Sequence, residues 1–220
     1  KPLGYEPGYP RDTATGALLA TFEHDRASLG LPLRCTLFGV AWSPDGSRIV
    51  TTCEQRIAVV WDVNRPEAPL AILRGHTEAV EWAAWSPDGK QIVTASYDQT
   101  VRVWNADGSG TALVLPHDSG VLSAVFNRDQ NRLLSVSSDD RSAYVWDLPA
   151  MRGAGSLVEP QRLRHENAIS AASFTPDGSS ALVASDRSVR LWHLDPVALR
   201  AQLAQLNEDC LDPVARATHL

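Results

Sequence analysis

The chain has 220 residues, of which 44% are hydrophobic and 21% charged, and this composition is typical of a globular protein with one or two domains. Its formal net charge is −6, which argues against nucleic acid as the main partner because phosphate binding needs a basic surface. No apolar run approaches the roughly 20 residues of a membrane span, so no membrane association is expected.

The first residues of the chain do not suit a central strand. Residues 1–11 contain Pro2, Pro7 and Pro10, which lack the backbone donor that such a strand needs, so this segment is expected to be irregular. The sequence TGALLATF at residues 15–22 then predicts a turn and a strand. Residues 12–22 are therefore expected to supply the outer strand of a sheet.

The rest of the chain repeats a short pattern four times. The sequence WSPDG occurs at residues 42–46 and again at 85–89, and the related FNRDQ and FTPDG occur at 126–130 and 174–178. A tryptophan after apolar residues follows each of these marks, at Trp61, Trp104, Trp146 and Trp192. The tryptophans are spaced 43, 42 and 46 residues apart, which indicates a repeat architecture.

Each repeat predicts four short antiparallel strands. In the second repeat, the apolar runs AVEWAAW, QIVTAS and VRVW are separated by the turn sequences SPDG and YDQT, and TALVL completes the unit. Valine, isoleucine and tryptophan favour strands, while Pro-Asp-Gly favours tight turns. The repeats are expected to cover approximately residues 24–73, 74–115, 116–163 and 164–194.

This pattern resembles the WD-repeat family of β-propellers. A period of about 40 to 45 residues, with a Gly-His pair before the strands and a Trp-Asp pair after them, is the signature of that family. The pairs that match it are Gly75-His76, Trp61-Asp62 and Trp146-Asp147. The resemblance implies an all-β fold of four four-stranded antiparallel blades, as a partial ring or a ring-closing segment.

The histidines, serines and aspartates have the residue types of a hydrolase triad, but they recur along the chain. A catalytic triad occurs once in a site, whereas a recurring set indicates architecture. The resemblance implies that a loop histidine, a hydroxyl, a turn aspartate and a tryptophan form one buried hydrogen-bonded network in each blade. The expected members are His76, Ser96, Asp98 and Trp104; His117, Ser138, Asp140 and Trp146; and His165, Asp186 and Trp192.

The hydroxyl member of this network has two candidates in the second repeat. It is either Ser96 or Thr94, two positions earlier on the same face of the strand. In the fourth repeat Ala184 stands where the serine is expected, and in the first repeat Cys53 and Gln55 replace the serine and the aspartate. The first blade is therefore expected to be the loosest.

A binding surface is expected where the repeat pattern does not fix the residue type. The resemblance places four such positions near the entrance of the propeller channel, namely Glu81, Trp82, Tyr97 and Asp139. Aromatic residues are enriched in binding hot spots, so these four are the candidate contacts for a protein or peptide ligand. The alternative is that Trp82 fills the gap between two blades.

The three cysteines, Cys35, Cys53 and Cys210, are odd in number and lack metal-binding spacing. They are expected to be thiols in a reducing cytoplasm. No metal and no cofactor are predicted, because the chain has neither a phosphate-binding loop nor a metal-binding motif.

A helix is expected after the fourth repeat, within a tail that covers residues 195–220. Asp195 and Pro196 favour a helix start, and leucines recur at helical spacing over residues 196–206. These leucines are Leu199, Leu203 and Leu206. The fourth repeat thus lacks an outer strand of its own, and residues 12–22 are expected to complete it.

Three arrangements of the blades are open. The chain is a C-terminal piece of a larger propeller, which is favoured and places missing blades upstream, or self-association of two chains builds an eight-bladed ring, or four blades close alone. The tail resembles the ends of bacterial proteins in which a propeller follows a signalling domain. The expected function is a non-catalytic, cytoplasmic scaffold or sensor domain. The alternatives are a propeller-borne hydrolase that uses His76, Ser96 and Asp98, and a purely structural assembly module.

Overall fold

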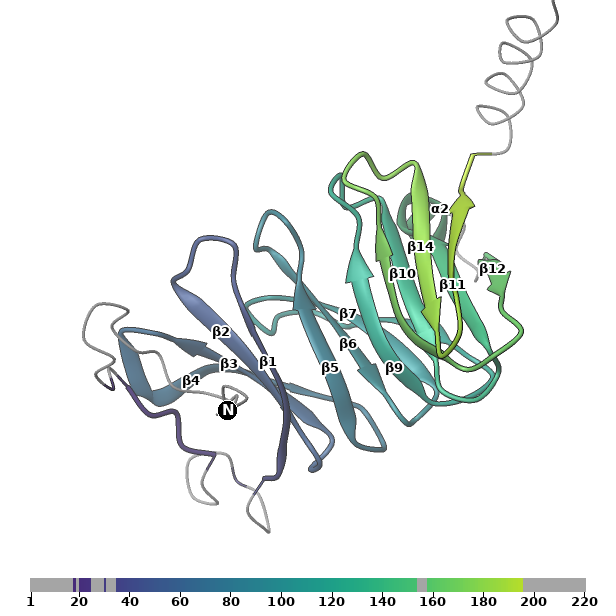
Figure 1. Ribbon diagram of the computed structural model, residues 1–220. Helices are drawn as coiled ribbons and strands as arrows, with labels where there is room; N and C mark the ends of the chain where they lie inside the picture. The colour runs from purple at the N-terminus through teal and green to yellow at the C-terminus, as the bar shows by residue number, and fades with distance from the viewer. Residues whose placement is uncertain (1–17, 19, 25–29, 31–34, 154–157, 196–220) are drawn as a thin grey trace, which may run out of the picture.

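The computed structural model describes residues 18, 20–24, 30, 35–153 and 158–195, and within them the chain forms four antiparallel sheets (Figure 1). The first sheet contains β1 (Leu37–Trp42), β2 (Arg48–Cys53), β3 (Ile57–Asp62) and β4 (Arg65–Arg74). The second contains β5 (Val80–Trp85), β6 (Gln91–Ser96), β7 (Thr100–Asn105) and β8 (Leu113–Pro116). The third contains β9 (Val121–Phe126), β10 (Arg132–Ser137), β11 (Ser142–Asp147) and β12 (Gln161–Arg164), with the short helix α2 (Leu148–Gly153) before β12. The fourth contains β13 (Ile169–Phe174), β14 (Ser180–Ser185) and β15 (Val189–His193).

Within each sheet, strands that are consecutive in the chain pair with each other, so every sheet is an antiparallel meander. Strands β1, β5 and β9 are neighbours across the sheets and form the inner wall of the arc. The all-β fold of propeller blades predicted from the repeats is confirmed. One detail differs, because the fourth sheet has three strands among the described residues instead of four.

The repeated turn sequence explains how the first hairpin of a blade closes. In the turn after β1, Asp45 accepts hydrogen bonds from the Ser43 hydroxyl (2.5 Å) and from the backbone and side chain of Ser47. Gly46 follows at a φ of 69°, a left-handed conformation that glycine adopts without strain. The Ser43 hydroxyl and the Ser47 donors lower the pKa of Asp45 to about 2, so the carboxylate that organises the turn stays charged.

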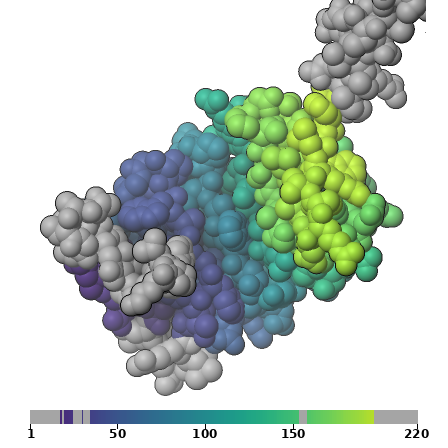
Figure 2. Space-filling model, in the orientation of Figure 1, coloured from purple at the N-terminus to yellow at the C-terminus, as the bar shows by residue number. Residues whose placement is uncertain are grey.

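The sheets are held together by apolar side chains that alternate along the strands. Three separate core clusters lie between neighbouring sheets, joining the first to the second, the second to the third and the third to the fourth. The first and fourth sheets lie at the two ends of an open arc (Figures 1 and 2). A closed four-bladed ring is therefore wrong for the described residues, because the two end sheets do not pack against each other.

The segment before β1 covers the outer face of the first sheet. Phe22 is buried there and its ring meets Trp61 edge-on at 5.8 Å between centroids, while His24 bonds the Thr51 hydroxyl at 2.7 Å. The prediction that residues 12–22 complete the fourth blade is therefore wrong for the described part of that segment. The reason is that the open arc separates the ends of the chain, so Phe22 packs on the nearest apolar face.

A disulfide links Cys35 to Cys53, with their Cα atoms 5.7 Å apart, so the prediction that these two cysteines are thiols is wrong. The hairpin register causes this pairing. Leu37 lies opposite Cys53, which brings the segment just before β1 to the end of β2. The spacing of the cysteines along the sequence does not predict that Cys35 and Cys53 lie close together in space. Cys210 lies outside the described residues.

Helix α2 is a single turn and a half between β11 and β12 that the sequence pattern did not predict. Asp147 caps it by accepting a hydrogen bond from the Ala150 backbone (2.9 Å). The helix predicted over residues 196–206 lies outside the described residues. Among the helices that the structure describes, none has the length and apolar character needed to cross a membrane.

Candidate functional site

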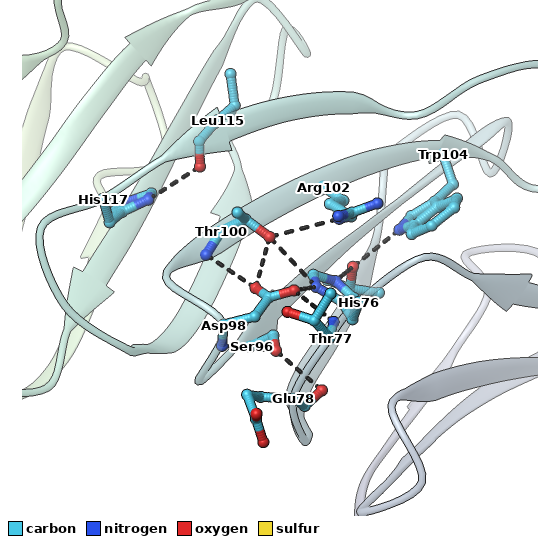
Figure 3. A network of polar contacts seen from close by, with 11 residues as sticks. His76, Thr77, Glu78, Ser96, Asp98, Thr100, Arg102, Trp104, Leu115 and His117 are labelled. Carbon is cyan, nitrogen blue, oxygen red and sulfur yellow. Dashed lines mark hydrogen bonds and ion pairs between the residues drawn. The ribbon is translucent and has the colours of Figure 1, made fainter.

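The second blade holds a complete buried network (Figure 3). His76 lies in the loop before β5, and its Nδ1 is 2.8 Å from the Asp98 carboxylate in the turn between β6 and β7. Its Nε2 is 2.7 Å from the hydroxyl of Thr94 in β6, and that hydroxyl also accepts a hydrogen bond from Trp104 Nε1 at 2.8 Å. The network therefore ties a loop, two strands and a turn of one blade together.

The proton positions in this network follow from its acceptors. The Asp98 carboxylate only accepts, so His76 Nδ1 carries a proton and donates it. In the neutral imidazole with Nδ1 protonated, Nε2 is the acceptor, so the Thr94 hydroxyl donates its proton to His76 Nε2. Burial alone would raise the pKa of Asp98, but hydrogen bonds from His76, Thr100 and Thr77 outweigh it and hold that pKa well below its usual range.

The hydroxyl at the centre of the network is Thr94, the alternative that the sequence left open, and not Ser96. The Ser96 hydroxyl donates to the Glu78 carbonyl (3.2 Å) and accepts from the Asp98 backbone (3.1 Å). Both side chains point to the same side of β6. Which of the two hydroxyls meets His76 therefore depends only on where the His76 loop lies along the strand. Thr100 is a member that sequence reasoning missed, and its hydroxyl donates to Asp98 at 2.6 Å.

The third blade keeps the histidine, hydroxyl and tryptophan but uses its aspartate differently. His117 Nε2 bonds the Ser135 hydroxyl at 2.7 Å, and Trp146 Nε1 donates to the same hydroxyl at 3.1 Å. His117 Nδ1 bonds the Leu115 carbonyl instead of Asp140. Burial lowers the pKa of His117 to about 4, so its imidazole is neutral at pH 7.

Asp140 in this blade is held by neighbours outside the predicted set. Tyr144 donates its hydroxyl to Asp140, and Arg162 in β12 donates to the same oxygen at 2.9 Å. The turn between β10 and β11 is one residue longer than its counterpart in the second blade, and Arg141 within it has a φ of 55°. That extra residue carries the carboxylate away from His117. The predicted member Ser138 bonds the neighbouring Asp139 and takes no part in the network.

The fourth blade lacks the central hydroxyl. Val183 pairs with Arg190 in the register position where Thr94 pairs with Arg102, so a valine replaces the threonine. Both ring nitrogens of His165 and Nε1 of Trp192 are buried without a hydrogen-bond partner. Asp186 is exposed and makes no hydrogen bond in the described structure. The sequence pattern predicted that the missing hydroxyl belongs at Ala184, which is one residue C-terminal to the actual position, Val183.

The first blade is better ordered than the sequence predicted. Thr51 takes the central place, bonding His24 at 2.7 Å and accepting from Trp61 Nε1 at 2.9 Å. Cys53, which stood in for the serine, forms the disulfide. Among the described residues, the fourth blade has the most unpaired buried polar atoms of this network, so that blade and not the first is the loosest.

Val183→Thr is expected to stabilise the fold by about 1–2 kcal/mol. The new hydroxyl accepts from Trp192 Nε1 and donates to His165, so two buried hydrogen bonds form where none exist. Denaturant unfolding measures the change. Val93→Thr is the matched control, because that buried valine faces no unpaired group and its hydroxyl should destabilise the fold. Equal destabilisation by both substitutions contradicts the assignment of Val183.

The chain of hydrogen bonds from Asp98 through His76 to Thr94 has the order of a hydrolase triad with threonine as the nucleophile. A nucleophile must reach its substrate, yet Thr94 is 0% exposed and its oxygen is also bonded to Trp104. The same histidine–hydroxyl–tryptophan arrangement recurs in the first and third blades. The arrangement in the second blade therefore stabilises the fold. Ser96 does not form the hydrogen bond to His76 that the hydrolase alternative requires.

The predicted partner contacts lie on the surface at the inner wall. Trp82 in β5 is 42% exposed and Tyr97, just after β6, is 47% exposed. Asp139 is exposed, and Glu81 is partly buried, which raises the pKa of its carboxyl. The β5–β6 register pairs Trp82 with Ala95, so Trp82 and Tyr97 lie at the same end of the second blade.

Trp82 borders a hollow of about 300 Å³ between β1 and β5. The lining residues are Phe38, Gly39, Val40, Ala41, Trp82, Ala83 and Ala84. A Cβ on Gly39 would approach the Thr52 hydroxyl at 3.0 Å and the Glu81 carbonyl at 3.3 Å, so glycine lets the two strands come close beneath the hollow. Phe38 is a large exposed residue that sequence reasoning did not select.

Tyr97 and Asp139 extend this surface to the third blade. The Tyr97 ring packs over Gly120, where a Cβ would lie 2.8 Å from its Cδ1 and 3.4 Å from the Ser138 hydroxyl. Asp139 follows Ser138 in the next turn. We call Phe38, Glu81, Trp82, Tyr97 and Asp139 the inner patch, a surface contributed by three blades.

No group of three or more metal-ligating side chains occurs within the part of the chain that the structure describes. A family model described as "WD domain, G-beta repeat" matches residues 33–62, 67–105, 111–147 and 159–193. DNA damage-binding protein 2 of Bos taurus is 31% identical over 84 residues, which cover 38% of the chain and 19% of that protein. The chain thus spans about a fifth of the length of this curated relative.

Proposed function

Because the chain belongs to the WD domain, G-beta repeat family, we propose that it is a non-catalytic platform whose inner patch binds a protein or peptide. The observation that carries this proposal is the pair of exposed aromatic side chains, Phe38 and Trp82, around the hollow on the inner wall. Aromatic residues over a concave apolar surface are the usual anchors of a binding hot spot. A partner side chain of moderate size fits this space.

The charge around the hollow favours a basic partner. Glu81 and Asp139 are both acidic members of the inner patch, and the chain as a whole carries a net charge of −6. A lysine or arginine beside an apolar residue would complement this surface. The same charge argues against nucleic acid, although the name of the bovine relative refers to DNA damage. A DNA duplex is therefore a useful negative control in any binding assay.

The wider setting of the platform is a further part of the proposal. We place it as a scaffold or sensor domain in a larger bacterial signalling protein, which rests on the sequence of the tail alone. The cytoplasmic location was predicted on the assumption that Cys35 and Cys53 are thiols. Their disulfide removes that support, because disulfides persist mainly in oxidising compartments.

Trp82→Ala and Tyr97→Ala are each expected to weaken ligand binding at least about tenfold without changing thermal stability. Peptides selected from a random phage-displayed library on the full chain serve as the probe, and calorimetry measures their Kd. The matched control is Trp42→Ala, which removes an exposed tryptophan outside the inner patch. Equal weakening by all three, or a large loss of thermal stability in Trp82→Ala, contradicts the proposed site; the latter shows that Trp82 packs between blades.

A further inference from the structure

A second hollow, of about 250 Å³, lies where the outer strands of the second and third blades approach each other. Its walls come from the end of β8, from β11 and from the beginning of β12. None of its lining residues belongs to the inner patch. We call this hollow the rim pocket, and the residues that matter for its chemistry are Pro116, Asp118, Tyr144, Trp146, Glu159 and Arg162.

The strand register explains why the rim pocket is open beside its tryptophan. Tyr144 pairs with Arg162, and Trp146 lies two residues later on the same side of β11. The Arg162 guanidinium lies over the Tyr144 ring at 5.3 Å and donates to Asp118 at 3.0 Å and to Asp140 at 2.9 Å. These contacts hold Arg162 toward the start of β11, so the space against Trp146 stays empty.

The second blade fills the corresponding space with a side chain of its own. Arg102 pairs with the central hydroxyl residue of its blade, as Tyr144 does in the third blade. The Arg102 guanidinium lies over the Trp104 ring at 5.9 Å (Figure 3). Gly75 makes room for it, because a Cβ there would lie 2.5 Å from Arg102 Nη1. The chain itself therefore places an arginine beside the repeat tryptophan.

The fourth blade also carries an arginine at this register position. Arg190 pairs with Glu166 at 2.5 Å. Glu166 directly follows the histidine of its loop, which is the position that Asp118 has in the third blade. The third blade thus keeps the acidic residue and the tryptophan, but it has Tyr144 where the second and fourth blades have arginine.

The charges around the rim pocket favour a cation. Three carboxylates, those of Asp118, Asp140 and Glu159, surround the single guanidinium of Arg162, which leaves a net charge of −2. Glu159 is exposed and has no hydrogen bond or ion pair among the described residues, and only one carboxylate oxygen of Asp118 is bonded. His117 adds no positive charge, because burial lowers its pKa to about 4.

We propose that the rim pocket is a second binding site, which takes one arginine side chain of a partner protein. The aliphatic part of that side chain lies against Trp146 and Pro116, as long basic side chains do on apolar surfaces. Its guanidinium binds Glu159 and the free oxygen of Asp118. The site is independent of the inner patch, so a partner that reaches both is held by two separate contacts.

A titration of the full chain with the blocked tripeptide acetyl-Gly-Arg-Gly-amide tests this proposal. The indole N–H signal of Trp146, assigned with Trp146→Phe, reports on the rim pocket in nitrogen-15 NMR spectra. It is expected to shift saturably with a Kd of about 1 mM. The same peptide with citrulline, which has the shape of arginine without its charge, is expected to bind at least about tenfold more weakly. An unmoved Trp146 signal, or equal binding of citrulline, overturns the proposal.

Substitutions of Glu159 separate this site from a general effect of charge. Glu159→Gln is expected to weaken binding of the arginine peptide about fivefold, and Glu159→Arg is expected to abolish it because the new side chain repels the ligand. Glu67→Gln and Glu67→Arg, at an exposed glutamate of β4, are the matched controls and should change the Kd less than about twofold. Equal effects at the two glutamates overturn the proposal.

The inner patch provides the remaining control. Trp82→Ala is expected to leave the Kd of the arginine peptide unchanged, although it weakens the peptides selected on the inner patch. Loss of arginine binding in Trp82→Ala overturns the rim pocket as the site. Conversely, Glu159→Arg should leave binding at the inner patch intact, so each of the two proposed sites can fail without the other.

Discussion

Asp98→Ala is expected to lower the free energy of unfolding by about 3 kcal/mol. The side chains of Asp98 and His76 are 2% and 1% exposed, so removal of the carboxylate leaves a protonated ring nitrogen buried with only the longer contact to the Thr100 hydroxyl at 3.3 Å. The Thr100 hydroxyl and the Thr77 backbone lose their acceptor as well. Each buried unpaired group costs about 1–3 kcal/mol, although relaxation and water entry recover part of the sum. Denaturant unfolding at pH 7 measures the change.

Asp186→Ala is the matched control for this experiment, since it removes the corresponding aspartate of the fourth blade. Asp186 is exposed and makes no hydrogen bond in the described structure, so the expected change is below about 0.5 kcal/mol. A sequence pattern alone treats the two aspartates as equivalent. Similar losses in the two variants contradict the network described for the second blade.

Loss of the Cys35–Cys53 disulfide is expected to lower the free energy of unfolding by about 3 kcal/mol. The bond spans 18 residues, and opening a loop of that size releases this much chain entropy in the unfolded state. Denaturation of the wild-type chain with and without dithiothreitol measures the effect, and Cys35→Ser should reproduce it. Cys210→Ser is the control and should leave stability unchanged. A thiol assay that finds three free thiols in the unreduced, unfolded chain contradicts the disulfide.

The repeat architecture was predictable because its signals are local. The turn after β1 needs only Ser43, Asp45 and Gly46 in order, and each repeat carries its own copy of such a turn. Strand alternation and the recurring tryptophans added a fixed period. Every one of these features lies within one repeat, so sequence reasoning found the blades and their order without knowledge of how the blades are placed in space.

The network was only partly predictable, because strand register and the position of each histidine loop determine which side chains meet. Thr94 and Ser96 lie on the same strand face, and only the position of His76 selects Thr94. One additional residue in a turn moved Asp140 from His117 to Arg162. These differences of a single residue change the hydrogen bonds without changing the pattern.

The disulfide and the open arc could not be predicted from the sequence pattern, for a different reason. Both depend on contacts between segments that are close in space, and the spacing of residues along the sequence does not predict those contacts. Cys35 reaches Cys53 because of how the chain enters β1, and Phe22 covers the first blade because the last blade is distant. Sequence periodicity counts blades, but it does not say whether the ends of the arc meet.

In the open arc, the stability of each blade depends on the blade itself and on its contacts with adjacent blades. Each blade contacts only its neighbours, so stability spreads along the chain as a sum of blade and interface contributions. The disulfide holds the segment before β1 against the first blade, while among the described residues the fourth blade packs on one other blade and has an unpaired His165. Local opening is therefore expected to start at the fourth blade and to advance toward the first.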